Sequence, residues 1–340
     1  MKTFNRSILS TVAMLLCLHA PARAATLYVG NSDSNGNGYI ESYNPPSGTG
    51  TQFASSGSYS AYSLAFDSAG NLYATVQASV GSPQIIKYTN TGGVLSSTGT
   101  TFTVCTGNYI PTGMAFDSAG NLYVANFNNT IEKYTSTGGV LSSNNTQFTS
   151  DVFNGPTGLA FDSVGNLYAA NGNNSTIQEY TFTGGVLSST GMQFANSSSG
   201  LSNPFGLAFD SVGNLYATNG NNTIEKFTST GGVLSGTGTQ FTSSGLSRPR
   251  GLAFDSADNL YVANQSSNTI VRYTSTGGVL SSTGTVFASG ASSGVNTPFF
   301  LAFAPAQVPE PSSAVLLLAG LATAAMHRRR KGVAQHACRP

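Results

Sequence analysis

Short apolar segments separated by polar turns recur along the whole chain. In one copy, Leu207–Phe209 is followed by the polar stretch Asp210–Asn214 and then by Leu215–Thr218. Such runs bounded by Asp, Gly and Asn are typical of β-strands joined by tight turns. A third strand is expected at Thr223–Phe227 and a fourth, outer strand around Phe241. The pattern therefore predicts units of four short strands.

This four-strand unit is repeated from one end of the chain to the other. The phenylalanine of the first strand recurs at Phe66, Phe116, Phe161, Phe209, Phe254 and Phe303, at intervals of 50, 45, 48, 45 and 49 residues. The second-strand tyrosine also occurs six times, at Tyr28, Tyr73, Tyr123, Tyr168, Tyr216 and Tyr261. A period of this length with four strands predicts the blades of a β-propeller.

The ends of the repeat region predict how the ring closes. The first copy opens at a second strand, Leu27–Asn31, and the last copy stops after a first strand, Phe300–Phe303. Each end supplies the strand that the other lacks, which leaves no free sheet edge. The predicted fold class is an all-β, six-bladed β-propeller spanning residues 25–307, with one blade closed by both termini.

Residues 1–24 have the organisation of a signal peptide. Lys2 and Arg6 precede the apolar run Ile8–Leu18, and Ala22–Ala24 fits a small-x-small cleavage site. A retained membrane anchor and a lipoprotein attached through Cys17 are the alternatives. Export is therefore expected.

Net charge and cysteine content narrow the class of partner. The chain has 14 basic and 13 acidic residues, but eight basic residues lie in the two ends and 12 acidic residues lie in the repeat region. The repeat region is therefore 6 − 12 = −6, without a basic stripe for nucleic acid. It holds one cysteine, Cys105, which is expected to be a small buried residue.

The repeated sequence resembles a known family. The pattern Pro-x-Gly-Leu-Ala-Phe-Asp-x-x-Gly-Asn-Leu-Tyr-Val-Ala-Asn, followed by Asn-Thr-Ile-x-Lys-Tyr, is similar to the NHL repeat over about 280 residues. NHL repeats often carry Asp where this chain has Asn126, Asn171, Asn219 and Asn264. The resemblance also implies kinship with six-bladed enzymes: gluconolactonase-like hydrolases, streptogramin lyase and peptide-amidating lyases. It is specific for the fold and not for the function.

The C-terminal residues resemble a PEP-CTERM sorting signal at 308–331. Val308, Pro309, Glu310 and Pro311 precede the apolar run Ser313–Met326, and Arg328, Arg329, Arg330 and Lys331 follow it. The resemblance implies a Gram-negative exporter, processing by an exosortase-type enzyme, and association with extracellular polysaccharide and biofilm matrix. The tail 332–340 is longer than usual in such signals. An ordinary C-terminal membrane anchor is the alternative.

Histidine chemistry is excluded from the repeat region, because His19, His327 and His336 all lie outside it. A gluconolactonase-like site would need carboxylates and Asn around a divalent ion. The repeated Asp residues are expected to shape turns, at Asp67, Asp117, Asp162, Asp210 and Asp255. Glutamates on the third strands are expected to be solvated, at Glu41, Glu132 and Glu225. The chain is therefore predicted not to be an enzyme.

One loop resembles the front half of a calcium-binding loop. Asp33, Asn35 and Asn37 occupy alternate positions before Gly38, and Glu41 follows. Position twelve is Asn44 instead of a bidentate Glu. The sequence thus gives calcium as a possible cofactor, and a longer turn between strands as the alternative.

A ligand site is expected where the repeats differ most. The residue inside Pro-x-Gly varies from blade to blade: it is Thr112, Thr157, Phe205 or Arg250. Phe299 follows Pro298, and Tyr62 occupies the corresponding place in the repeat that lacks Pro. An aromatic and Arg cluster could stack on sugar or peptide groups, and channel packing is the alternative.

The sequence therefore predicts an exported, non-catalytic binding or scaffold module of the cell surface or extracellular matrix. Its expected partners are an exosortase-type enzyme, a polysaccharide or surface protein, and the membrane before processing. A metal-dependent gluconolactonase-like hydrolase or lyase is the alternative. A hydrated, glycosylated structural protein is a third possibility.

Overall fold

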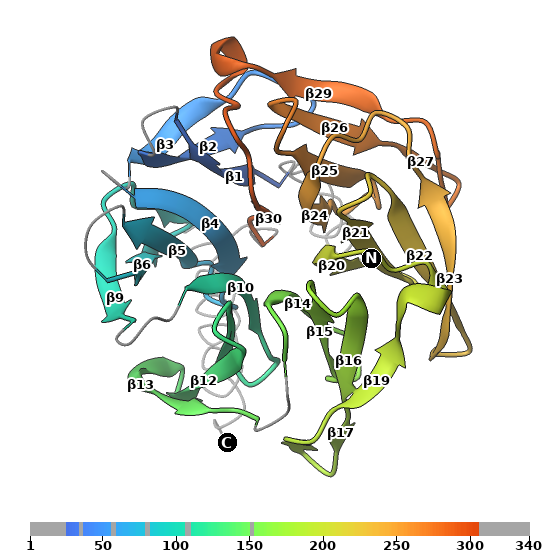
Figure 1. Ribbon diagram of the computed structural model, residues 1–340. Helices are drawn as coiled ribbons and strands as arrows, with labels where there is room; N and C mark the ends of the chain where they lie inside the picture. The colour runs from blue at the N-terminus through green and yellow to red at the C-terminus, as the bar shows by residue number, and fades with distance from the viewer. Residues whose placement is uncertain are drawn as a thin grey trace, which may run out of the picture. The chain divides into compact units, whose positions relative to one another are not determined.

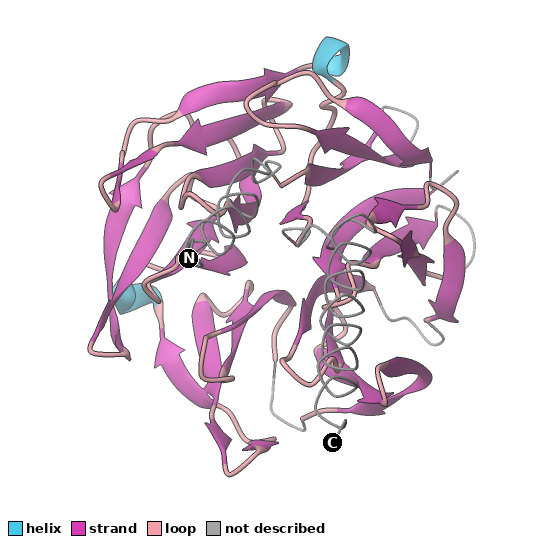
Figure 2. Cartoon of the chain, turned by 180° about the vertical axis from the view of Figure 1, so that it is seen from behind, coloured by secondary structure: helices cyan, strands magenta, loops and turns pink. Residues whose placement is uncertain are grey.

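The computed structural model describes residues 25–33, 37–55, 59–78, 82–105, 110–149 and 153–305. These residues form six antiparallel sheets of four strands arranged around a common centre (Figure 1). The view from behind shows strands and loops almost throughout, with two short 3₁₀ turns, η1 (Ser197–Ser199) and η2 (Ala291–Ser293) (Figure 2). The predicted all-β, six-bladed propeller is confirmed.

Blade 1 closes the ring with strands from both ends of the chain. Its strand order is β3 (Thr51–Ser55), β2 (Gly38–Tyr43), β1 (Leu27–Ser32) and β30 (Leu301–Phe303). Strands β1 and β30 are antiparallel, with Leu27 opposite Phe303 and Val29 opposite Leu301. The two chain ends therefore supply the second and first strands of one sheet, as the sequence predicts.

The other five blades follow in chain order, each running from the first strand near the channel to the fourth strand at the rim. Blade 2 contains β4 (Tyr59–Phe66), β5 (Leu72–Ala78), β6 (Gln84–Tyr88) and β9 (Thr100–Val104). Blade 3 contains β10 (Pro111–Phe116), β11 (Leu122–Asn126), β12 (Thr130–Thr137) and β13 (Val140–Gln147). Blade 4 contains β14 (Pro156–Phe161), β15 (Leu167–Asn171), β16 (Thr176–Tyr180) and β19 (Met192–Ala195).

Blade 5 contains β20 (Pro204–Phe209), β21 (Leu215–Asn219), β22 (Ile224–Thr230) and β23 (Val233–Thr242). Blade 6 contains β24 (Pro249–Phe254), β25 (Leu260–Asn264), β26 (Thr269–Tyr273) and β29 (Thr285–Ser289). Small two-stranded ribbons extend blades 2, 4 and 6: β7 (Asn90–Thr91) with β8 (Val94–Leu95), β17 (Phe182–Thr183) with β18 (Val186–Leu187), and β27 (Ser275–Thr276) with β28 (Val279–Leu280).

The repeated Asp-x-x-Gly-Asn turn joins the first strand to the second. In blade 5, the Asp210 carboxylate accepts hydrogen bonds from the Asn214 backbone N–H at 2.8 Å and from its side-chain amide at 2.6 Å. Gly213 adopts a φ of 87°, which favours glycine, and in blade 6 Asp258 occupies that position with a φ of 58°. We call the side of the propeller that carries these turns the turn face.

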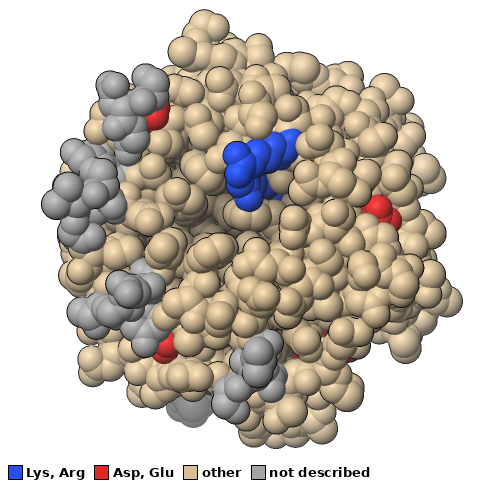
Figure 3. Space-filling view, viewed as in Figure 1, with Lys and Arg blue, Asp and Glu red and all other residues tan. Residues whose placement is uncertain are grey.

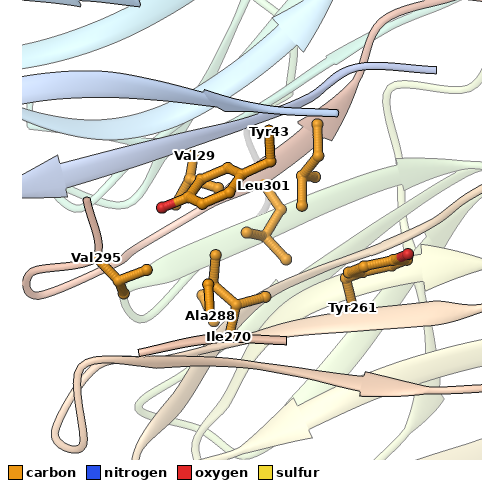
Figure 4. Packing of buried hydrophobic residues seen from close by; sticks show 9 residues of the cluster. Val29, Tyr43, Tyr261, Ile270, Ala288, Val295 and Leu301 are labelled. Carbon is orange, nitrogen blue, oxygen red and sulfur yellow. The ribbon is translucent and has the colours of Figure 1, made fainter. Parts of the chain in front are cut away.

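The hydrophobic core consists of six clusters, one between each pair of neighbouring blades. Figure 4 shows the cluster between blades 6 and 1, where Val29 and Tyr43 pack against Tyr261 and Ile270. Edge-to-face aromatic pairs recur in these interfaces, such as Tyr216 with Phe254 of the next blade at 5.2 Å between ring centroids. Tyr and Phe thus provide the large contacts in a chain without tryptophan.

Candidate functional site

A pocket of about 300 Å³ opens where the first strands of blades 4, 5 and 6 begin, at the end of the channel opposite the turn face. We call it the channel-mouth pocket. Three further loops contribute, including the turns between the second and third strands of blades 4 and 5. Its lining residues are Phe127, Gly155, Thr157, Gly172, Asn173, Asn203, Pro204, Phe205, Gly220, Arg248, Pro249 and Arg250.

Arg250 is held in this pocket by stacking and by one hydrogen bond. Its guanidinium carbon lies 4.0 Å from the ring centroid of Phe205, and its Nε donates to Gln265 Oε1 at 2.9 Å. Burial and the neighbouring Arg248 lower the pKa of Arg250 to about 10, so the group stays charged at neutral pH. None of the residues that line the pocket is acidic. The positive charge therefore has no carboxylate partner there.

Arg248 places a second guanidinium at the rim of the pocket. Its side chain is exposed, its φ is 51°, and its backbone N–H donates to Asn222 Oδ1 at 2.6 Å. Figure 3 shows a compact basic surface beside the hollow at the centre of this face. Two uncompensated cations in one pocket favour an anionic ligand.

Aromatic side chains pack against one another close to Arg250. The Tyr62 and Phe299 rings lie 4.4 Å apart between centroids, and Phe205 lies 5.6 Å from Phe300. Burial raises the pKa of Tyr62, and the positive charge of Arg250 partly offsets that rise. Phe205 and Tyr62 thus place aromatic surface beside the charged group of Arg250.

The structure brings four of the six predicted ligand-binding residues together: Tyr62, Phe205, Arg250 and Phe299. Thr112 and Thr157 are buried, at 7% and 3% exposure, although Thr157 also lines the channel-mouth pocket. The Thr112 hydroxyl donates to the Pro156 carbonyl at 2.8 Å, and the Thr157 hydroxyl donates to the Pro204 carbonyl at 3.0 Å. These threonines tie neighbouring blades together. Ligand binding by the six positions stays a prediction.

Arg248, Asn173, Asn203 and Phe127 also line the pocket, and sequence reasoning did not select them. The positions of the basic residues within the repeats distinguish Arg248. Four of the six basic residues in the repeat region share one third-strand position, at Lys87, Lys133, Lys226 and Arg272. Arg248 and Arg250 alone depart from that repeated position.

The predicted calcium loop has the sequence pattern of the repeated turn. Asp33-Ser-Asn-Gly-Asn37 has the same Asp-x-x-Gly-Asn pattern as the turns on the turn face. The Asp33 carboxylate accepts from the Asn37 backbone at 2.8 Å and from its side chain at 2.9 Å. Asn35 lies outside the described residues. Among the residues that the structure describes, no group of three or more His, Cys, Asp or Glu converges. Calcium binding stays a prediction.

The expectation that the third-strand glutamates are solvated is wrong. Glu41, Glu132 and Glu225 are only 5%, 6% and 4% exposed. They lie two residues before an inward-facing Tyr or Phe, so strand alternation turns them towards the preceding blade. Desolvation raises the pKa of all three, that of Glu41 to about 7. Glu132 also lines a pocket of about 270 Å³ between blades 2 and 3.

Cys105 lines the same pocket beside Glu132. It is a free cysteine and is buried, as the sequence predicts. Burial and the nearby Glu132 raise the pKa of its thiol to about 11, so the thiolate is disfavoured at neutral pH.

The six four-stranded sheets around a common channel place the chain in the class of six-bladed β-propellers. Residues 36–237 match the family described as the SMP-30/gluconolactonase/LRE-like region. This match spans more than half of the chain, and the chain therefore belongs to that family. Residues 307–331 match the PEP-CTERM protein-sorting motif. No curated protein sequence matches the chain.

Solved structures with the same fold include enzymes. A protein from Bacteroides uniformis, named provisionally as a 6-phosphogluconolactonase, is 15% identical, with a TM-score of 0.57 over 83% of this chain and 99% of the other. A streptogramin B lyase is 16% identical, with a TM-score of 0.55 over 84% and 92%. A catalytically inactive virginiamycin B lyase from Staphylococcus aureus, solved with quinupristin, is 16% identical, with a TM-score of 0.53 over 84% and 94%. Identities this low show the fold alone.

The sorting motif carries information about location. It implies export, sorting to the cell surface, processing by an exosortase and a C-terminal membrane segment. The predicted signal peptide and the residues of the motif lie outside the described residues. Within the described part of the chain, no helix has the length and apolar character needed to cross a membrane.

Proposed function

We propose that this chain is a non-catalytic binding module of the cell envelope or extracellular matrix, built from NHL-type repeats. The channel-mouth pocket would bind an anionic group of a glycan, peptide or protein, and exopolysaccharide of a biofilm is one such ligand. The observation that carries the proposal is the pair Arg248 and Arg250, which share one pocket without an acidic partner among its lining residues.

The chemistry of the lining residues supports binding. Arg250 is preorganised by Phe205 and Gln265, so little side-chain entropy is lost when it meets an anion. Asn173 and Asn203 offer both donors and acceptors to hydroxyl or amide groups. A divalent metal ion, which gluconolactonase-like chemistry would require, does not fit this pocket. Its lining offers amide and hydroxyl oxygens but no carboxylate, and both arginines would repel the ion.

A metal-dependent hydrolase or lyase is the second candidate, and family membership favours it. The virginiamycin B lyase that shares the fold is described as inactive after a histidine was replaced by alanine. This chain has no histidine between residues 25 and 305. A catalytic function would therefore need a different set of residues from that lyase.

The test compares binding with hydrolysis on purified residues 25–307. We expect acidic oligosaccharides or peptides on an array to bind, and binding to weaken as salt is added. Arg250→Gln should weaken binding by about tenfold or more, because a charge-assisted contact is lost. Arg272→Gln removes an equal charge from a repeated third-strand position and should leave binding unchanged.

Two results would contradict the proposal. The first is metal-dependent turnover of gluconolactone by the natural chain above the uncatalysed rate. The second is equal binding by the natural chain and the Arg250→Gln variant.

A further inference from the structure

Five of the six blades carry the same protruding hairpin, with the sequence Thr-Gly-Gly-Val-Leu. In blade 3 the two glycines have φ values of 59° and 80°, the left-handed pair that a tight two-residue hairpin requires. A Cβ placed on either Gly138 or Gly139 would meet no atom within 4 Å. The hairpin tips therefore stand clear of the rest of the propeller.

An exposed valine follows the glycines in every one of these hairpins. The exposed fractions are 71%, 72%, 69%, 72% and 71% for Val94, Val140, Val186, Val233 and Val279. The leucine after each valine points the other way and packs on an inter-blade cluster, as Leu141 does. Packing thus explains the leucines and leaves the valines unexplained. We call these five valines the valine ring.

The valine ring lies on the turn face, where the chain also leaves the propeller. In blade 5 the hairpin is tied to the turn, because the Ser229 N–H donates to Asn214 Oδ1 at 2.9 Å. In blade 1 the two chain ends replace that turn. The Ala304 N–H donates to the Thr26 carbonyl at 2.9 Å, as the Asp210 N–H donates to the Asn214 carbonyl in blade 5.

The channel mouth lies on the opposite side. Strand β24 begins with Pro249, which lines the mouth, and ends with Phe254, next to the Asp255 turn. The two faces are thus separated by the length of the first strands.

The connection from the propeller to the apolar C-terminal run is short. Pro305 is the last described residue, and the run begins at Ser313, which leaves 313 − 305 − 1 = 7 residues, 306–312, between them. The eight Cα–Cα steps from Pro305 to Ser313 span at most about 28 Å when fully extended. This is little more than the length of one propeller strand with its turn. A membrane that holds the run must therefore lie near the point where the chain leaves the turn face.

We propose that the turn face is a membrane-contact surface while the C-terminal segment is retained. The valine ring would touch the lipid interface, and the channel mouth would point away from it. The free energy falls when apolar side chains at the tips of rigid hairpins move from water into the lipid interface. The turn face carries both acidic and basic side chains, such as Asp117 and Lys133. The lipid surface that it would contact is therefore zwitterionic. This inference does not depend on the proposed ligand.

The absence of tryptophan from the chain permits a direct test. The full chain is reconstituted in phosphatidylcholine vesicles that contain lipids brominated near the headgroup. We expect Val140→Trp to give fluorescence that the bromolipid quenches roughly twofold or more, since an interfacial indole reaches the bromines. Phe127→Trp, at a 49% exposed position on the channel mouth, should be unquenched. Equal quenching at the two positions, or quenching at neither, would overturn the proposal.

A second series of variants distinguishes lipid contact by the valines from the effect of the C-terminal tether alone. In the Val140→Trp chain, the other four valines are changed to threonine, which keeps the β-branched shape but adds a hydroxyl. We expect quenching to fall, with an unchanged melting temperature because these side chains are exposed. Unchanged quenching would show that the tether alone holds this face near the lipid and would refute contact by the valine ring.

Discussion

The asparagine that ends the second strand makes hydrogen bonds that an aspartate could not make. Asn219 is fully buried, and its Oδ1 accepts from the Ser202 N–H at 3.1 Å. Its Nδ2 donates to the Gly200 carbonyl and to the Thr223 hydroxyl, both at 3.0 Å. A carboxylate could accept but not donate. The amide therefore fits a site that presents both an N–H and a carbonyl of the incoming loop.

The first prediction concerns this residue. Asn219→Asp should lower the free energy of unfolding by about 2 kcal/mol or more, because it buries a charge and leaves the Gly200 carbonyl unpaired. Asn221→Asp is the control, since Asn221 is exposed and its Oδ1 accepts a hydrogen bond from the Thr223 hydroxyl, as a carboxylate also could. Chemical denaturation of both variants measures the difference. Equal losses would contradict the assigned role of the Asn219 amide.

The buried glutamates give a second prediction, on pH dependence. Desolvation raises the pKa of Glu225 above the value of about 4.3 for an unfolded chain, so the folded state binds the proton more tightly. Stability from this group is full below the unfolded pKa and is lost as the pH rises through the folded pKa. Glu225→Gln should therefore be more stable than the natural chain at pH 8 and similar at pH 4. Denaturation at both values checks this, and an equal effect at both would refute it.

At the scale of elements, the glycine of Pro-x-Gly determines how closely the first strands of neighbouring blades pack against each other. A Cβ at Gly206 would lie 2.5 Å from the Arg250 carbonyl oxygen and 2.7 Å from Leu252 Cδ2. Strand β20 therefore packs against β24 only if this residue lacks a side chain. The varying residue beside it is then directed towards the channel, where Phe205 meets Arg250.

This leads to the third prediction. Gly206→Ala should destabilise the propeller by about 1–3 kcal/mol through overpacking. It should also weaken ligand binding at the channel mouth, because β20 carries Phe205. Gly172→Ala, whose nearest contact would be 3.3 Å away, should cost less stability. Thermal unfolding followed by circular dichroism would rank the two, and the reverse order would contradict the packing argument.

At the scale of the whole molecule, the ring is closed by one short strand. β30 contributes Leu301, which is 5% exposed and packs in the cluster between blades 6 and 1 (Figure 4). The chain ends meet where the Ala304 N–H donates to the Thr26 carbonyl. The covalent break in the ring could therefore lie elsewhere without loss of any sheet.

The fourth prediction tests this closure. A circular permutant that joins Pro305 to Ala25 and opens between Gly138 and Gly139 should melt within about 5 °C of residues 25–305, because an exposed hairpin tolerates new ends. A chain that stops at Thr297 should melt at a much lower temperature and aggregate, since it loses β30 and exposes the edge of β1. A truncated chain as stable as the permutant would refute the role of β30.

Periodicity in the sequence was enough for the fold, since six phenylalanines and six tyrosines specify six blades and strand alternation specifies their cores. The sequence also predicted that both ends of the repeat region contribute to one blade, because each end lacks the strand that the other holds. The glutamates that were expected to be solvated show the limit of such reasoning. Spacing does not tell which side of a strand Glu225 takes.

The sequence by itself determined the repeat, the all-β propeller, its closure and the C-terminal sorting motif, because these depend on local pattern. Only the tertiary structure decided which of the varying residues share a surface. Thr112 and Thr157 hold equivalent positions to Phe205 and Arg250, yet the threonine hydroxyls bond to neighbouring blades while the larger side chains reach the channel. Arg248 joins Arg250 at the mouth because a loop with positive φ brings it there. Such proximity arises from the packing of neighbouring blades, which no single repeat encodes.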